Sequence, residues 1–204
     1  MRDFDVISID IETSGTDVDT HTLLSIGCVR LSDMQSFYTE VRHESFEMSP
    51  ESARVHGLNL TNRDSKKLPK MSQVDVHLRD WLKKSEFYRE SKSYTIIPMG
   101  MNVGSFDMQF VRKFLPKSFS LLGYRSIDLN ALMFTDALMR GKRFKEVKSF
   151  AKEIGRFYAI EKVPDRHPHD ALFDAWVNVG VFHHLVHDEL TTVGEIHFEG
   201  GNLK

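Results

Sequence analysis

The sequence predicts an α/β fold in which α-helices flank a mixed five-stranded β-sheet. Three strand-like segments open the chain, all before residue 42. Two further strand-like segments follow, and amphipathic helices separate them from each other and from the first three. Helical patterns occupy most of the chain after residue 129. The resulting order, β-β-β-α-α-β-α-β-α-α-α, is typical of one sheet with helices packed on it.

The three opening strands are predicted from alternation and from apolar runs. Residues 4–11 place isoleucines on one face and polar side chains on the other, as a mostly buried strand does. Residues 20–31 and 35–41 are rich in β-forming residues and are separated by the short turn "SDM".

The next segment is predicted to be a short helix followed by a loop. Over residues 49–57, Ser49 is the expected N-cap, Pro50 occupies the first helical position and Gly57 ends the helix. Residues 58–70 are polar and predict a loop.

The middle of the chain alternates helix and strand. Apolar residues at helical spacing predict a helix over residues 72–84, and residues 94–100 predict the fourth strand. A helix should follow, with Ser105 as its cap and three phenylalanines on its inner face.

The last strand and three helices complete the pattern. Residues 123–129 predict a fifth strand, and helices are expected over residues 129–140 and 144–154. Apolar residues spaced alternately by three and four predict a long final helix over residues 168–187.

Size and composition are those of one globular domain, expected over residues 1–188, with a short C-terminal tail at 189–204. The 204 residues are 41% hydrophobic, and no apolar run approaches the ~20 residues of a membrane span.

The single cysteine, Cys28, lies in an apolar run, which favours a buried thiol and a reducing cytoplasmic compartment. The net charge of −2 neither indicates nor excludes a nucleic-acid partner, since bound divalent cations invert the sign of an acidic pocket.

Acidic residues lie at the ends of predicted elements. Asp10 and Glu12 end the opening strand on the same face, Asp107 begins an amphipathic helix, and Asp174 begins the final helix. Each has an ordinary alternative as a solvated strand end or a first-turn acid. If the four converge, their repulsion requires cations, and hard divalent ions such as Mg²⁺ or Mn²⁺ prefer oxygen ligands. Two such ions form a site for displacement at phosphorus, and His169, five residues before Asp174, is the candidate base.

Three segments make this pattern specific. "IDIETSG", "NVGSFDMQF" and "HDALFDA" occur in that order and resemble the three exonuclease motifs of the DEDDh branch of the DEDD superfamily, the proofreading-exonuclease-like group. "LLSIGCVRL", "SPESARVHGL" and "RSIDL" add supporting similarity, so that the resemblance covers about residues 5–187.

The resemblance implies an RNase H-like fold and a two-metal 3′→5′ exonuclease that releases nucleoside 5′-monophosphates from DNA or RNA with a free 3′ end. It implies that the four carboxylates bind two Mg²⁺ or Mn²⁺ ions and that His169 is the general base. It also implies that Thr13 and Asn102 contact or shape the site of the terminal nucleotide, and His56 is a further candidate there, with a structural role at a helix end as the alternative. Some relatives form dimers, so a homodimer is compatible with it.

Two departures from the family motifs bear on which function the chain has, and three basic clusters bear on where it contacts nucleic acid. Many relatives have histidine where this chain has Met101, and the spacing from Asn102 to the motif aspartate is one residue longer than in bacterial proofreading subunits. Both favour a stand-alone nuclease over a polymerase proofreading subunit, which is the third hypothesis; the second is a non-catalytic nucleic-acid-binding module. Local basic clusters are candidates for phosphate contact, with "RGKRFKEVK" (140–148) preferred over 62–70 and 112–117.

Overall fold

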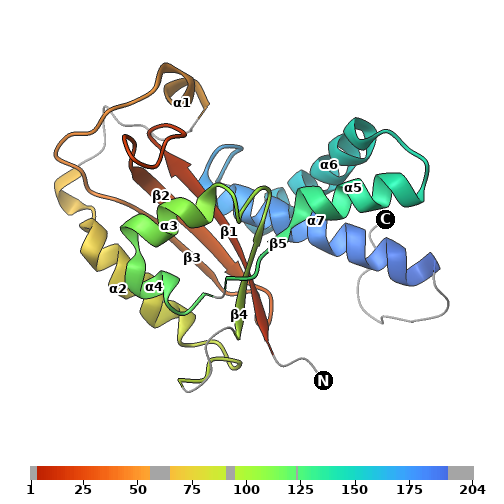
Figure 1. Cartoon of the computed structure of the whole chain (residues 1–204), viewed down its shortest axis with the longest axis horizontal. Helices are drawn as coiled ribbons and strands as arrows, with labels where there is room; N and C mark the ends of the chain where they lie inside the picture. The colour runs from red at the N-terminus through yellow and green to blue at the C-terminus, as the bar shows by residue number, and fades with distance from the viewer. Residues whose placement is uncertain (1–3, 56–64, 91–94, 123, 193–204) are drawn as a thin grey trace.

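Five strands form one mixed sheet in the order β3-β2-β1-β4-β5 in the computed structural model, which describes residues 4–55, 65–90, 95–122 and 124–192 (Figure 1). β1 (Asp5–Thr13), β2 (Leu23–Arg30) and β3 (Ser36–Glu40) are antiparallel neighbours. β4 (Ile96–Gly100) pairs with β1 in parallel, and β5 (Ile127–Asp128) pairs with β4 in parallel. The predicted mixed five-stranded sheet is confirmed.

One face of the sheet is covered by α2 (Met71–Leu82), α3 (Asp107–Phe114) and α4 (Pro116–Phe119). The alternating isoleucines of β1 point into this layer and form a core with apolar residues of α2 and α3. The free thiol of Cys28 is buried in the same core, as predicted. Alternation along β1 therefore leaves its polar side chains on the opposite face.

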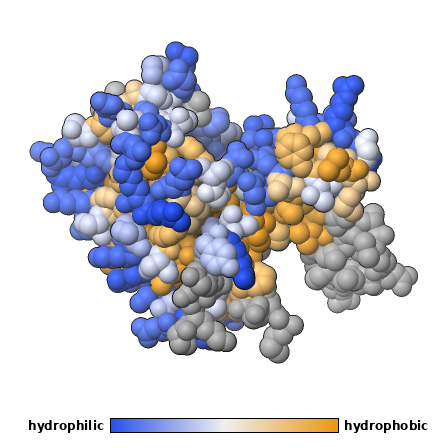
Figure 2. Space-filling model, viewed as in Figure 1, coloured by the Kyte–Doolittle hydropathy of each residue, from blue (hydrophilic) through white to orange (hydrophobic). Residues whose placement is uncertain are grey.

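The opposite face carries α7 (Ala171–Thr192), which packs on β1 and β2. α5 (Leu129–Met139) and α6 (Phe144–Lys162) pack in turn against α7 and extend beyond the sheet (Figure 1). Figure 2 shows apolar side chains gathered on this α5–α6 lobe. The large exposed apolar residues of the two helices are Phe134, Leu138, Met139, Phe150, Phe157 and Ile160. Within the described residues, no helix is long and apolar enough to cross a membrane.

The short helix predicted near residue 50 is present as α1 (Pro50–Val55), and a 3₁₀ turn follows at η1 (Ser65–Lys67). The Ser49 hydroxyl accepts a hydrogen bond from the Ser52 backbone N–H at 3.1 Å, which confirms the predicted N-cap. The expectations for His56, Gly57, loop residues 58–64 and the tail from 193 lie outside the described residues.

Several boundaries differ from the predictions. The cap of α3 is Phe106 without a side-chain bond, because the Ser105 hydroxyl donates instead to the Asn102 carbonyl at 3.1 Å. α4 was not expected, β5 has only two residues, and α6 continues to Lys162 rather than ending at 154. α7 continues to Thr192, whereas the final helix was expected to end at residue 187.

Candidate active site

The end of β1 presents its polar face to α7. The Ser8 hydroxyl donates a hydrogen bond to the Ala175 carbonyl of α7 at 2.8 Å, which fixes the strand against the helix. Asp10 and Glu12 follow on the same face at the period of two. The pairing of β1 with β2 is irregular between Glu12 and Thr13, and such bulges re-aim side chains beside functional sites.

Gly27 of β2 brings the start of α7 close to this pair. It lies opposite Asp10 in the sheet, and a Cβ at Gly27 would overlap the backbone of Ala171 and Leu172. The missing side chain lets the first turn of α7, with Asp174, approach the sheet. Gly27 was not singled out in the sequence, although a glycine inside a strand is itself a signal for close backbone approach.

Three predicted acids meet at this point. Carboxylate oxygens of Asp10, Glu12 and Asp174 all lie within 4.8 Å of one another. Asp107, the first residue of α3, is buried and lies outside this group of three. The Ile11 backbone N–H lowers the pKa of the Asp107 carboxyl, so Asp107 lies beside the end of β1, and its charge raises the pKa values of Asp10 and Glu12. The four acids form one electrostatic cluster.

Burial is the main cause of raised pKa values throughout the cluster. Burial, together with the charges of the other three acids, holds the pKa of Asp10 well above its usual value. Burial and the charges of Asp174, Asp170 and Asp107 raise the pKa of Glu12 to about 8, and burial raises the pKa of Asp107 to about 7. Burial also raises the pKa of Asp174, and Lys152 of α6 offsets part of the effect at Asp10 and Asp174.

An all-oxygen set of buried and half-buried, mutually repelling carboxylates fits hard divalent cations. One lysine cannot neutralise four acids, and without further positive charge the acids must retain protons near neutral pH. Mg²⁺ and Mn²⁺ bind carboxylate oxygens and supply the missing charge. The donor set therefore matches a divalent metal centre.

We expect metal-free stability to fall as pH rises through the cluster's pKa values. The pKa of Glu12 is about 8 in the folded chain against 4.5 for the free side chain, so protonated Glu12 contributes stability that is full below pH 4.5 and is lost as pH rises through 8. Between pH 6 and 8.5 the loss is about 2 kcal/mol, or about 5 °C in Tm. Thermal scans of the metal-free chain at several pH values measure it.

Saturating Mn²⁺ should raise Tm more at pH 8.5 than at pH 6, because protons compete with the metal for the same carboxylate oxygens.

Glu12→Gln is the matched control for the metal-free measurement, since its amide does not titrate. The metal-free Tm of this variant should depend less on pH. An equal decline of Tm with pH in Glu12→Gln and the unmodified chain would contradict the role of Glu12 in this effect.

The candidate base lies directly before α7. His169 is exposed and has a left-handed backbone with φ of 66°. Its backbone N–H donates to Asp174 Oδ2 at 3.0 Å, which ties the histidine's own loop to the acidic cluster. His167 is also exposed, and its Nδ1 contacts the neighbouring Pro168 carbonyl at 3.0 Å.

A residue pair that the sequence reasoning did not identify holds this loop. Asp170 Oδ1 accepts the backbone N–H groups of Leu172 and Phe173 at 3.0 and 3.2 Å and so caps α7. Arg166 binds both oxygens of Asp170 at 2.8 and 2.6 Å, and its guanidinium lies 3.8 Å from the ring centroid of Tyr38 in β3. An aspartate before an apolar helix is a recognisable cap signal, whereas the contact with Tyr38 depends on the assembled sheet.

The predicted substrate-binding residues have structural contacts as well. The buried Thr13 hydroxyl donates to the Gly15 carbonyl at 2.7 Å. Asn102 is exposed, with φ of 58°, in the turn after β4. Its side-chain carbonyl accepts from Asn130 at 2.8 Å and its backbone N–H donates to Asp128 at 3.2 Å, so it holds the turn that precedes Asp107.

Comparison with known proteins identifies similar exonucleases. No protein-family model matches the chain. It is 26% identical over 181 residues to an Escherichia coli protein named 3′-5′ DNA exonuclease Cap18, and the match covers 86% of this chain and 88% of that protein.

Solved structures of Exonuclease I share the fold. Exonuclease I from Methylocaldum szegediense superposes with a TM-score of 0.62 at 14% identity, covering 93% of this chain and 42% of that one. The zinc-bound Escherichia coli enzyme with single-stranded DNA gives a TM-score of 0.61 at 14% identity, covering 93% of this chain and 43% of that one. The chain thus spans less than half of the length of these structures. The RNase H-like fold and the resemblance to DEDD-type exonucleases are confirmed.

Proposed function

We propose that this chain is a 3′→5′ exonuclease that hydrolyses single-stranded DNA at its 3′ end. The observation that carries the proposal is the acidic cluster, which β1, α3 and α7 assemble within an Exonuclease I-like fold. The similar Escherichia coli protein is named as a 3′-5′ DNA exonuclease and matches over most of both chains, which supports DNA as the substrate. RNA with a free 3′ end is a second candidate substrate.

In the proposed mechanism, Asp10, Glu12, Asp107 and Asp174 hold two divalent ions, Mg²⁺ or Mn²⁺. Such ions, when bound, lower the pKa of water and stabilise negative charge on phosphate oxygens. His169 accepts the proton of the attacking water, since it is exposed beside Asp174 and is held there by its own backbone N–H. Water adds to the terminal phosphorus, the bond to the 3′ oxygen of the preceding nucleotide breaks, and that oxygen takes up a proton. The product is a nucleoside 5′-monophosphate.

Further residues complete the proposed site. Thr13 lies directly after Glu12 at the irregularity of β1, and Asn102 shapes the turn before Asp107, so both are proposed to border the terminal nucleotide. His56 remains a proposed contact from the sequence resemblance. We also propose a cytoplasmic location, with a homodimer as a compatible assembly.

Two other functions make different predictions. A non-catalytic nucleic-acid-binding module would not require the complete set of four acids and the histidine that is present here. A proofreading subunit would show the same chemistry, with activity that depends on a polymerase partner.

The proposal is tested by degradation of 5′-labelled single-stranded DNA, duplex DNA and single-stranded RNA side by side. We expect stepwise shortening of single-stranded DNA from its 3′ end with Mg²⁺ or Mn²⁺, and none with chelator. Chromatography should identify nucleoside 5′-monophosphates as products. Absence of shortening on all three substrates would refute the exonuclease, and internal cleavage would assign a different nuclease class.

A further inference from the structure

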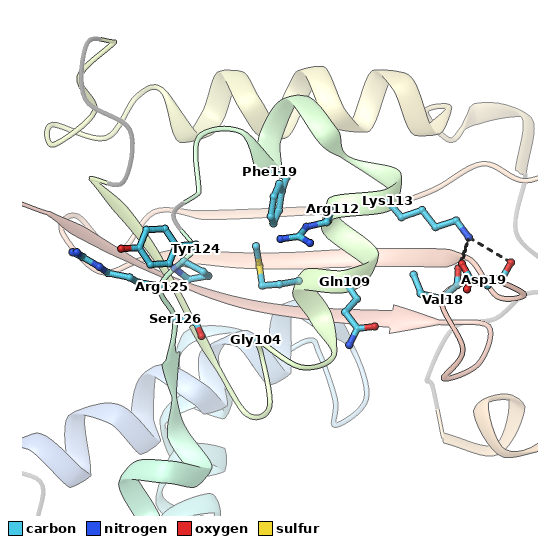
Figure 3. A pocket seen from close by; sticks show the side chains of 12 residues that line it. Val18, Asp19, Gly104, Gln109, Arg112, Lys113, Phe119, Tyr124, Arg125 and Ser126 are labelled. Atoms are coloured by element: carbon cyan, nitrogen blue, oxygen red, sulfur yellow. Dashed lines mark hydrogen bonds and ion pairs between the residues drawn. The ribbon is translucent and has the colours of Figure 1, made fainter.

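A groove of about 500 Å³ lies along the exposed flank of α3 (Figure 3). Its walls come from α3, from Phe119 of α4 and from the segment that leads into β5. Gly104 lines it, three residues before Asp107 in the chain, so the groove begins close to the start of α3. An added Cβ at Gly104 would lie 2.8 Å from Ser126 Oγ, which shows how closely the two walls approach there.

The groove is positively charged in a chain whose net charge is −2. Arg112, Lys113 and Arg125 line it together with one acid, Asp19. Lys113 already engages that acid, with 3.4 Å between Nζ and the Asp19 carboxylate, and it donates to the Val18 carbonyl at 2.6 Å. The uncompensated charge of the groove therefore belongs to the two arginines.

An aromatic ring lies beside each of the two arginine guanidinium groups. The Arg112 guanidinium lies 4.8 Å from the ring centroid of Phe119, and Figure 3 shows it pointing from α3 into the groove beneath that ring. The Arg125 guanidinium lies 5.5 Å from the ring centroid of Tyr124, whose side chain is 73% exposed. Within the described residues, neither arginine forms an ion pair.

An exposed ring beside a guanidinium is suited to a nucleotide. The ring stacks on a base of any sequence, and the guanidinium binds a phosphate oxygen. The volume of the groove is within the range of sites for ligands of nucleotide size. Positive charge and aromatic surface together are the usual features of sites for single-stranded nucleic acid.

We propose that this groove binds upstream nucleotides of the single strand whose 3′ end occupies the acidic cluster. The inference rests on the proposed function, and it adds that the chain binds its substrate along α3. Arg112 and Arg125 bind phosphates, and Tyr124 stacks on a base. The shorter the strand, the fewer of these contacts it makes.

The basic cluster at residues 140–148 is the alternative contact surface. There Arg140 pairs with Asp136, and Arg143 lies 3.9 Å from Glu146, so part of its charge is balanced locally. The α3 groove has no comparable neutralisation of its arginines, which favours it over that cluster.

The test compares two double variants, each lacking two positive charges. Arg112→Gln with Arg125→Gln removes the groove arginines, and Arg143→Gln with Lys145→Gln removes exposed charges of the alternative cluster. Fluorescence anisotropy of a 5′-fluorescein oligo(dT) of 20 nucleotides with Ca²⁺ should show affinity about tenfold or more weaker for the groove variant only. Its slope of log affinity against log salt should be shallower by about 1.4, as two lost phosphate contacts require. Tyr124→Ala should weaken binding about tenfold, and Tyr124→Phe should retain it.

A hydrolysis assay distinguishes a wrong assignment of the groove from a wrong proposed function. With Mn²⁺, the groove variant should cleave the dinucleotide dTpT as fast as the unmodified chain, because the single phosphate of dTpT is the one hydrolysed and no upstream phosphate is left for the two arginines. Equal affinity of the groove variant and the unmodified chain, or a larger loss in the Arg143–Lys145 variant, would overturn the groove assignment. If the unmodified chain binds the strand through the groove but hydrolyses nothing, the proposed function fails while the groove assignment holds.

Discussion

Asp10→Asn should lower the rate of mononucleotide release from single-stranded DNA by at least about 10³-fold. Asp10 belongs to the group of three carboxylates whose oxygens lie within 4.8 Å, and an amide cannot replace its charge in a divalent metal centre. Losing metal stabilisation of about 4 kcal/mol corresponds to that factor. The measurement is the initial rate with saturating Mn²⁺ at fixed enzyme concentration.

The same substitution should leave the metal-free chain folded. Burial already favours the neutral form of Asp10, so a neutral amide of the same shape should keep or raise the metal-free Tm near neutral pH. The matched control is Asp80→Asn, an exposed aspartate of α2 that pairs with Arg79, and its rate should stay within about twofold. Retained activity in Asp10→Asn would remove Asp10 from the catalytic centre.

His169→Asn should lower the turnover rate by about 10²- to 10⁴-fold, the usual contribution of a positioned general base. Asparagine is chosen because it tolerates the left-handed backbone at φ of 66°, and the backbone N–H that binds Asp174 is retained. The loop and Asp174, a proposed metal ligand, should therefore keep their positions, and Mn²⁺ affinity should change little. Single-turnover rates with saturating Mn²⁺ isolate this chemical step.

His167→Asn is the control for that experiment. His167 is exposed two residues away, and its ring nitrogen contacts the neighbouring Pro168 carbonyl. Its rate should remain within about threefold. A large loss in His167→Asn with little change in His169→Asn would transfer the role of base to His167.

Local patterns were sufficient to predict the strands and the order of the acidic motifs. The alternation in β1 is a property of consecutive residues, so it shows both the isoleucine face and the shared side of Asp10 and Glu12. The N-cap at Ser49 is likewise set by residues within one helical turn. The resemblance to known motifs, rather than periodicity, related Asp107 and Asp174 to the pair on β1.

Features that depend on packing between distant segments were not predicted. Gly155 lies inside α6, where an added Cβ would be 2.5 Å from the Val177 carbonyl of α7, and a Cβ at Gly180 would be 2.8 Å from Gly155 Cα. The two helices cross at these glycines, so Gly155 permits the crossing instead of ending the helix at 154. The approach of Gly27 to Ala171, which positions Asp174, likewise involves segments far apart in the chain.

The start of α3 was mispredicted for a related reason. Ser105 has the right residue type for an N-cap, but the left-handed turn at Asn102 directs its hydroxyl to the Asn102 carbonyl. α4 has only four residues, too few to show helical periodicity in the sequence.

Direct measurement of Mn²⁺ binding by electron paramagnetic resonance tests the central claim, that the acids at the end of β1 form a divalent metal centre. At pH 8 the unmodified chain should deplete free Mn²⁺ with a stoichiometry near two ions per chain, and binding should weaken at pH 6 as Glu12 and Asp107 retain protons. Asp10→Asn should lose most of this binding and Asp80→Asn should keep it. Equal Mn²⁺ binding by Asp10→Asn and the unmodified chain, or no binding by either, would contradict the assignment.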